Sequence, residues 1–339
     1  MFKRLSNKVL LPVFLLLLVV FLVLEYGGFG KVKPTIPSNL GQVDTSKVKA
    51  LRVYKNGPSP LFELVKKKGE WKVKKDGKTY NAQGTSIERS LVDLSGLTPE
   101  RLVTSDTAKW DQYRVGKNSR RIEVRGSEGT LLDLMVGKMS VSKQKGKGAR
   151  AMMRRRRRPN IKFHVRPVEQ KNVYKVKGRA MMRFRRGYQG WVDHSIIDGP
   201  QENWKELKLS SGDSSLTLKK KKDSWRSTGA SMDSSAIQSY MNALAELEGR
   251  TFTPSAKAGS LKNVALQLQI KRQQKGAIRV KAYPAVKDTT TSYYIKSSMN
   301  PGLIFKDRDS SLYKKMIPGG TEEKAPSPKR RRALRQRTP

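Results

Sequence analysis

The sequence predicts an α+β fold, in which an N-terminal transmembrane helix precedes two tandem units, each a mainly antiparallel sheet with one amphipathic helix. Three observations lead to this prediction. The chain opens with basic residues and a long uncharged apolar run, a set of segments recurs in the same order about 150 positions later, and short alternating strands separated by turn residues occur in both copies. A chain of 339 residues with 36% hydrophobic residues is long enough to form two cores.

Residues 1–30 are interpreted as a signal anchor. Three basic residues lie within the first eight positions, before an uncharged run from Val9 to Leu24. A spanning helix needs about 17–25 mostly apolar residues, and the run reaches this length if Glu25 extends to the interface and the residues after it are included. Only Gly28 and Gly30 approach the small-residue spacing of a cleavage site, so an uncleaved anchor is favoured over a cleaved signal peptide.

The basic residues before the run predict that the N-terminus is cytoplasmic and that the bulk of the chain is extracytoplasmic. Long downstream domains are translocated largely regardless of their own charge. Lys31 and Lys33 follow the run closely and weaken the charge asymmetry, which leaves a cytoplasmic body open as the alternative.

Residues 31–46 are rich in turn formers and are expected to be a linker to the first α+β unit, residues 47–200. Short β-like runs separated by Gly-containing turns predict an antiparallel meander, and a helix is expected after it. Thr85 and Glu88 have capping-box spacing, and Gly96 stands at the exit. The apolar stripe of this helix consists of Ile87, Leu91 and Leu94.

The second α+β unit is expected over residues 201–317 because the same order recurs there. Trp225 corresponds to Trp71, each after a lysine-rich stretch, and both are expected in the core. Asp233 is predicted as the N-cap of the second helix and Gly249 as its stop. The residues that repeat the first helix and its exit are Ile237, Met241, Leu244 and Leu247. Residues 318–339 lack a core-forming pattern and are predicted to be a disordered basic tail.

Four ordered segments resemble the bacterial family catalogued as domain of unknown function 4340: "LLDLMVGK" at 131–138, "FHVRP" at 163–167, "VYKVKG" at 173–178 and "WVDHSIID" at 191–198. The resemblance covers roughly residues 45–317. It implies a membrane-anchored envelope protein, sometimes encoded beside ABC-type transporters related to gliding motility, with no established biochemical activity. Together with the N-terminal anchor, this leads us to expect a single-pass protein of the bacterial inner membrane. The chain departs from the family pattern in lacking a lipoprotein cysteine and in carrying an inserted run of arginines.

The net charge of +43 favours a polyanionic partner. Two copies of "RAMMR", at 150–154 and 179–183, bracket two strands that should form a hairpin, so both basic segments are expected at one end of the first sheet. Met152 and Met153 are candidates for shallow contact with a membrane interface, with strand-end packing as the alternative for such methionines. The candidate polyanion-binding residues are Arg150, Arg154, Arg155, Arg156, Arg157, Arg158, Arg179, Arg183, Arg185 and Arg186.

Carboxylates are too few to pair five adjacent arginines, so this run must stay solvated or meet an external polyanion. Anionic lipid or acidic envelope glycan is the expected partner, because the anchor restricts the chain to the neighbourhood of a membrane. A merely solvated loop is the alternative reading of the arginine run. Nucleic acid is the alternative partner, since the tail carries a second basic cluster, "PKRRRALRQR".

Catalytic and metal motifs are missing from the sequence. The chain has no cysteine, which excludes thiol nucleophiles and thiolate metal sites, and no phosphate-loop, nucleophile-elbow or zinc-protease motif is present. His194 lies between Asp193 and Ser195, but adjacent side chains point in different directions and do not by themselves form a triad. We therefore expect no enzyme, cofactor or metal site, and we expect a membrane-anchored interaction or scaffold protein of the envelope, accessory to an ABC-type transporter. An enzyme or small-ligand receptor with a pocket that no linear motif reveals is a further alternative.

Overall fold

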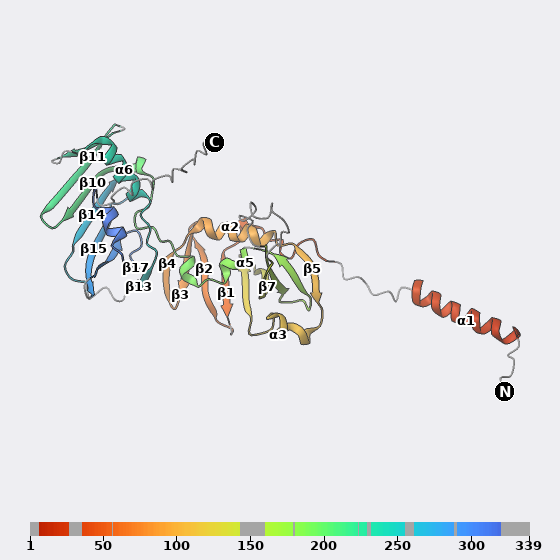
Figure 1. The fold of residues 1–339 in the computed structure, drawn as a ribbon. Helices are drawn as coiled ribbons and strands as arrows, with labels where there is room; N and C mark the ends of the chain where they lie inside the picture. Colours follow the sequence, from red (N-terminus) through yellow and green to blue (C-terminus); the bar gives the residue numbers. More distant parts are fainter. Residues whose placement is uncertain are drawn as a thin grey trace, which may run out of the picture. The chain divides into compact units, whose positions relative to one another are not determined.

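The computed structural model describes residues 7–26, 36–55, 57–142, 160–178, 180–222, 224–228, 232–254, 261–287 and 290–319. Within these ranges the protein is α+β, with two antiparallel sheets and few helices, as the sequence predicts (Figure 1). The chain divides into two compact units, one of residues 1–69 with 84–190 and the other of residues 70–83 with 191–339.

The N-terminal run forms helix α1 (Asn7–Tyr26), shown in red in Figure 1. Its side chains are described from residue 12 to residue 22, and the large apolar side chains from Val13 to Leu22 are exposed. Over the part of the chain that the structure covers, no helix combines the length and the hydropathy needed to cross a membrane. The predicted tail lies outside the described residues from residue 320 onward.

Among the described residues, nine strands form the first sheet, in the order β4-β3-β2-β1-β6-β7-β8-β9-β5. The strands are β1 (Ala50–Lys55), β2 (Pro60–Lys67), β3 (Glu70–Lys75), β4 (Lys78–Asn81), β5 (Pro99–Thr104), β6 (Arg120–Arg125), β7 (Thr130–Ser142), β8 (Asn160–Pro167) and β9 (Val173–Lys177). The predicted antiparallel meander is therefore confirmed.

Helix α2 (Gly84–Ser95) runs across one side of this sheet (Figure 1). Its predicted stripe of Ile87, Leu91 and Leu94 is fully buried. Alternate side chains of the central strands, such as Val53 and Ile122, are buried as well and complete the core. Two shorter helices that the sequence analysis did not predict, α3 (Trp110–Tyr113) and α5 (Ala180–Phe184), belong to the same unit.

Strands β8 and β9 form an antiparallel hairpin, in which Lys162 is opposite Lys177. The start of β8 and the end of β9 therefore lie at one end of the sheet. Ser142, the last residue of β7, is opposite Asn160, so the chain leaves β7 and enters β8 at that same end. The prediction that the two basic segments start from one end of the sheet is confirmed for the strands that carry them.

Among the described residues of the second unit, eight strands form a sheet of order β12-β11-β10-β14-β15-β16-β17-β13. The order matches that of the first sheet strand for strand, apart from β4, which supports the predicted repeat. The strands are β10 (Trp204–Ser211), β11 (Ser214–Lys221), β12 (Ser224–Thr228), β13 (Phe252–Pro254), β14 (Leu266–Arg272), β15 (Ile278–Lys287), β16 (Thr290–Ser297) and β17 (Leu303–Asp307).

Helix α6 (Ser234–Ala245) starts after Asp233, the predicted N-cap. The predicted stop at Gly249 is wrong, because the helix ends at Ala245 with Glu246 as its C-cap. Gly249 instead lies against Phe305, whose ring an added Cβ would overlap, so packing rather than helix termination requires the glycine. A further helix, α7 (Ser311–Met316), follows the last strand of the unit.

The two repeated tryptophans occupy equivalent strands. Trp71 is the second residue of β3 and Trp225 is the second residue of β12, which have the same place in their sheets. Both side chains are buried, as predicted. The helix stripes agree too, since Ile237, Met241 and Leu244 of α6 are buried like their counterparts in α2.

Candidate functional site

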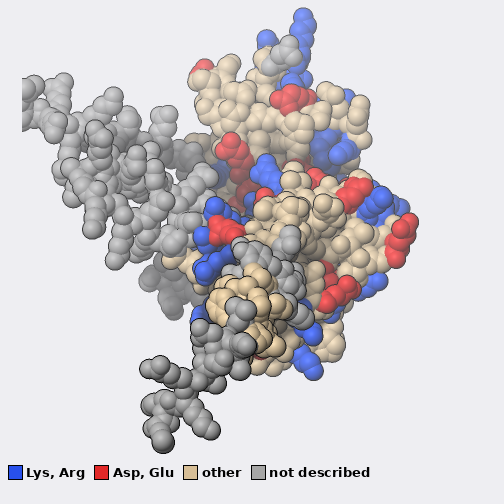
Figure 2. All heavy atoms as spheres, turned by 90° about the vertical axis from the view of Figure 1, so that its right-hand side faces the viewer, with Lys and Arg blue, Asp and Glu red and all other residues tan. Residues whose placement is uncertain are grey.

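Charged side chains of both signs are scattered over the face of the molecule that Figure 2 shows. In the view of Figure 2, groups of Lys and Arg alternate with groups of Asp and Glu over the parts that are coloured. The excess of basic residues in the sequence therefore does not form one continuous patch on the described part of this face. A functional site must be identified from local clusters and their contacts.

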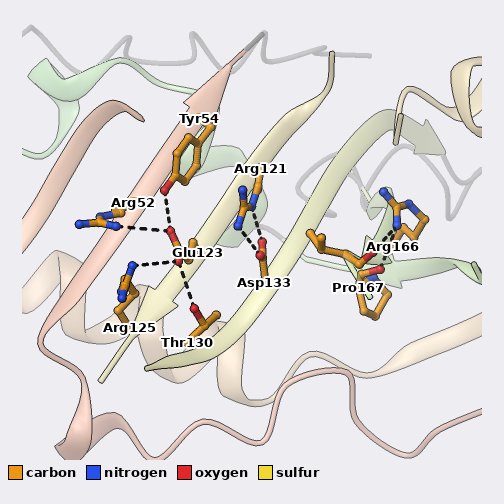
Figure 3. A network of polar contacts seen from close by, with 10 residues as sticks. Arg52, Tyr54, Arg121, Glu123, Arg125, Thr130, Asp133, Arg166 and Pro167 are labelled. Carbon is orange, nitrogen blue, oxygen red and sulfur yellow. Dashed lines mark hydrogen bonds and ion pairs between the residues drawn. The ribbon is translucent and has the colours of Figure 1, made fainter. Parts of the chain in front are cut away.

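The face of the first sheet opposite the α2 core carries a charged network centred on Glu123 (Figure 3). Glu123 on β6 is only 4% exposed, and its carboxylate accepts hydrogen bonds from the Tyr54 hydroxyl at 2.6 Å and from the Thr130 hydroxyl at 3.1 Å. The guanidinium groups of Arg52 and Arg125 lie 3.9 and 3.6 Å from the same carboxylate. The buried charge is thus paired and hydrogen-bonded.

Burial by itself raises the pKa of Glu123, but the hydrogen bonds from Tyr54 and Thr130, together with the charges of Arg121 and Arg125, outweigh it and leave the pKa below its ordinary value. Arg121 also forms a two-pronged ion pair with Asp133 at 2.7 and 2.6 Å. Because the charges in this network satisfy one another, we interpret it as structural.

Arg166 on β8 is buried and is held by carbonyl oxygens (Figure 3). It donates to the carbonyls of Val115, Val168 and Gln170, and its guanidinium stacks 3.9 Å from the ring centre of Trp110. This arginine therefore fixes α3 and two loops against the sheet, which explains the arginine of the "FHVRP" segment.

The "LLDLMVGK" segment lies on β7 and ends in a bulge between Val136 and Met139. Within the bulge, Gly137 lies so close to α3 that an added Cβ would overlap the carbonyl oxygen of Tyr113. The bulge also places Lys138 on the surface beside the start of β6. The segment thus shapes one end of the first sheet.

A cavity of 540 Å³ lies at that end. We call it the basic-end pocket, and define it by its six charged lining residues: Lys55, Asp111, Arg114, Arg120, Lys138 and Arg185. Lys55 ends β1 and is opposite Arg120, which starts β6 and is in turn opposite Val136 of β7. Strand register thus brings together cations from separate parts of the chain.

Five of the six charges are positive, and within the described residues none of these five cations forms an ion pair with a carboxylate. Arg120 is the cation most withdrawn from water, and it donates to the carbonyl oxygen of Phe184. Burial, followed by the neighbouring charge of Arg185, lowers the pKa of Arg120. The pocket therefore has an excess of positive charge that an anion would relieve.

The basic-end pocket lies near the root of the arginine-rich segment. Met139 lines the pocket, and Ser142, the last described residue of β7, is three residues further along the strand, about 10 Å at the usual strand rise. Residues 143–159 carry nine basic residues and no acidic one: Lys143, Lys145, Lys147, Arg150 and the five from Arg154 to Arg158. Both features therefore belong to one end of the sheet.

Most of the predicted polyanion-binding residues lie outside the described residues: Arg150, Arg154, Arg155, Arg156, Arg157, Arg158 and Arg179, together with the two predicted interface methionines, Met152 and Met153. Arg185 lines the basic-end pocket, and Arg186 is exposed. Arg183 donates to the Ser90 hydroxyl at 3.0 Å, which ties α5 to α2. In the second "RAMMR" copy, Met181 is buried and Met182 is exposed.

Sequence reasoning missed the four other cations of the pocket, Lys55, Arg114, Arg120 and Lys138. Two of these cations are adjacent to patterns that the sequence analysis recognised: Lys138 ends the "LLDLMVGK" segment, and Lys55 precedes the predicted turn at Asn56-Gly57. Their convergence depends on strand register, which these signals do not specify.

The "DHS" trio at 193–195 is arranged as a turn. The Ser195 hydroxyl donates to the Asp193 carboxylate at 2.7 Å, and the Ser195 amide donates to the same oxygen at 3.0 Å. The His194 ring lies edge-on to Phe252, at 5.4 Å between ring centres. Across the ranges that the structure describes, no group of three or more His, Asp or Glu residues could hold a metal ion.

Comparison with known proteins identifies a family. The family model described as "Domain of unknown function (DUF4340)" matches residues 71–267, more than half of the chain. No curated protein and no solved structure shows a significant match. The matched range contains the "LLDLMVGK" bulge, the buried arginine strand and the start of the second copy, and the chain belongs to the DUF4340 family.

Proposed function

We propose that this protein is a membrane-anchored, non-catalytic interaction protein of the bacterial envelope, with the basic end of its first sheet facing an anionic lipid surface. In this proposal α1 and the uncharged residues 27–30 that follow it attach the chain to the inner membrane, and the bulk of the chain is extracytoplasmic. An ABC-type transporter subunit is the protein partner that the family resemblance suggests.

The observation that carries the proposal is the exposure of α1. The ten large apolar residues from Val13 to Leu22 are between 40% and 65% exposed, so no described protein surface covers them. Apolar side chains gain about 25 cal/mol for each Å² removed from water, which makes a lipid environment favourable for this helix. Since no described helix is by itself long and apolar enough to cross a membrane, the proposal also rests on the sequence, where basic residues precede the uncharged run from Val9 to Leu24, a pattern typical of a signal anchor.

The charge distribution supports the anionic surface. The basic end of the first sheet combines the unpaired cations of the basic-end pocket with the root of the arginine-rich segment. Each Arg near an anionic leaflet is worth about 1 kcal/mol, so the run from Arg154 to Arg158 would contribute several kcal/mol to such an orientation.

Alkaline carbonate washing of membranes tests the anchor. We expect the full-length chain to stay in the membrane pellet. A variant with Leu16→Arg and Leu17→Arg is expected in the soluble fraction, because each central charge costs about 2.5–3.5 kcal/mol on insertion. Recovery of the wild-type chain as a soluble form that starts near Lys31 would contradict the anchor.

Hydrogen exchange of the full-length chain in nanodiscs tests the orientation. Slower exchange at residues 136–142 and 160–163 is expected in phosphatidylglycerol than in phosphatidylcholine discs, and salt should reduce the difference. Changing Arg154 to Arg158 to Ser should remove the difference. The matched control changes five tail arginines to Ser and should preserve it: Arg330, Arg331, Arg332, Arg335 and Arg337.

Equal protection in both lipids would contradict the proposed orientation. Tighter, sequence-selective binding to a nucleic acid would replace the lipid surface as the partner. Preferential binding to an acidic glycan, with no lipid dependence, would likewise reject the lipid surface.

A further inference from the structure

We propose that the basic-end pocket binds a phosphoryl group. This proposal goes beyond the membrane role, because it depends only on described side chains of the first unit and not on α1 or the arginine run. It assigns a ligand class to a cavity in which strand register gathers cations that lack carboxylate partners.

The charge balance of the pocket favours an external anion. Five cations and one carboxylate, Asp111, line 540 Å³. The neighbouring sheet face shows the contrast, since Arg121 and Arg52 there have ion-pair partners in Asp133 and Glu63 at 2.6 and 2.9 Å. The arginines of that network thus have carboxylate partners, whereas the cations of the pocket have none among the described residues.

Arg120 is the positioning centre of the pocket. Its hydrogen bond to the Phe184 carbonyl uses one arm of the guanidinium and fixes the group beside Arg185. A guanidinium presents five N–H donors in a planar fork, so donors remain for an anion. Holding two arginines close together without an anion costs repulsion, which a bound dianion would remove.

A phosphoryl group fits this donor set better than a carboxylate does. It presents three or more acceptor oxygens and up to two negative charges, whereas a carboxylate has two oxygens and one charge. Arginine forks bind phosphate oxygens in a two-pronged manner, and lysine supplies point charges. Asn118 and Ser119 add neutral hydrogen-bonding groups to the lining, as sites for phosphate esters often do.

Calorimetric titration with inorganic phosphate tests the proposal, using the full-length chain in an uncharged maltoside detergent. The test variant combines Lys138→Gln with Arg185→Gln, both at exposed positions of the pocket. We expect at least a tenfold loss of phosphate affinity, which corresponds to about 1.4 kcal/mol. The matched control combines Lys117→Gln with Arg186→Gln. Both residues are exposed and lie outside the lining of the pocket, so this variant loses the same two charges but should change the phosphate affinity less than about twofold.

The Asp111→Asn variant is expected to change the phosphate affinity in the opposite direction. Removing the pocket's one carboxylate should strengthen phosphate binding, since a like charge near the anion is lost. A variant that merely damaged the fold would weaken binding instead. The proposal is overturned if the wild type binds phosphate no better than chloride, if the control loses as much affinity as the test variant, or if Asp111→Asn fails to strengthen binding.

A second titration, with a soluble phosphodiester, distinguishes a lipid headgroup from a free phosphate or a monoester as the natural ligand. Glycerophosphoglycerol is the soluble phosphodiester headgroup of phosphatidylglycerol. Binding comparable to that of inorganic phosphate would support a lipid headgroup as the source, and binding of inorganic phosphate alone would support a free phosphate or a monoester. Because no membrane is present in either titration, failure of the proposed membrane function would leave these results intact.

Discussion

The Tyr54 hydroxyl on β1 donates a 2.6 Å hydrogen bond to the buried carboxylate of Glu123 on β6. Both residues lie on the sheet face opposite the α2 core, where the carboxylate also meets Arg52 and Arg125. The pair thus connects two neighbouring strands through a carboxylate that is only 4% exposed.

A double-mutant cycle should measure the Tyr54–Glu123 contact. Tyr54→Phe and Glu123→Ala are expected to couple by about 1.5–3 kcal/mol, the usual range for hydrogen bonds to charged groups. The measurement is the free energy of unfolding by chemical denaturation. Tyr174→Phe is the control, because Tyr174 is three strands away on β9, and its effect should add to that of Glu123→Ala within about 0.5 kcal/mol.

The tryptophans of the repeat should be equally important for stability. Trp71→Ala and Trp225→Ala are each expected to cost about 3–5 kcal/mol, the range for deleting a large buried aromatic. Val92→Ala, at a side chain that is 60% exposed, should stay within about 0.5 kcal/mol of wild type in the same denaturation experiment. A near-neutral result for either tryptophan would indicate a surface role for that residue.

Gly137→Ala should destabilise the first unit. The added methyl group would overlap the Tyr113 carbonyl, and overpacking of this kind costs about 1–3 kcal/mol. Gly187→Ala provides the control, since a Cβ there meets no atom within 4 Å. The thermal midpoint should fall for Gly137→Ala alone, and equal midpoints for the two variants would argue against the close approach of α3 to β7.

Asp307 should make stability depend on pH. Burial raises the pKa of this carboxyl in the folded state, while backbone amides of Tyr313 and Leu312 partly offset the rise and the nearby Asp309 adds to it. The folded state therefore binds the proton more tightly than the unfolded state, whose aspartate pKa is about 3.9. The contribution of Asp307 to the free energy of unfolding is therefore fully present below the unfolded-state pKa of about 3.9. It is lost as the pH rises through the raised pKa of the folded state.

Asp307→Asn should remove this loss, because an amide does not titrate and its oxygen can still accept the 2.8 Å hydrogen bond from the Tyr313 amide. Relative to wild type, the variant is expected to gain stability as the pH rises from about 4 through the raised pKa. Denaturation midpoints over a pH series measure the difference. Identical pH profiles for the two proteins would show that Asp307 does not carry this linkage.

Much of the fold follows from local patterns in the sequence. Alternation of apolar and polar residues identified the strands on either side of both helices, and the spacing of Ile87, Leu91 and Leu94 identified the buried face of α2. The recurrence of Trp71 as Trp225 identified the repeat, which the matching strand orders support. These features could be predicted because hydrophobic periodicity and turn-forming residues depend only on positions that are close together in the sequence.

Other features could not be predicted because they depend on residues that are distant in the sequence. Short helices such as α5 give little periodicity, and Gly249 could not be distinguished from a helix stop without the ring of Phe305 beside it. The charge network of Glu123 arises only when β1, β6 and β7 are aligned in one register.

For the candidate site, local sequence patterns were enough to show that the chain is strongly basic, that five arginines are adjacent between two predicted strands, and that one hairpin brings two basic segments to the same end of the first sheet. The folded chain was needed to show that Arg185 lies with Lys55, Arg120 and Lys138 around one cavity, while Arg183 is bound to α2. The physical reason is that a charge cluster is set by strand register and helix packing, which place side chains from remote positions within a few ångströms of one another.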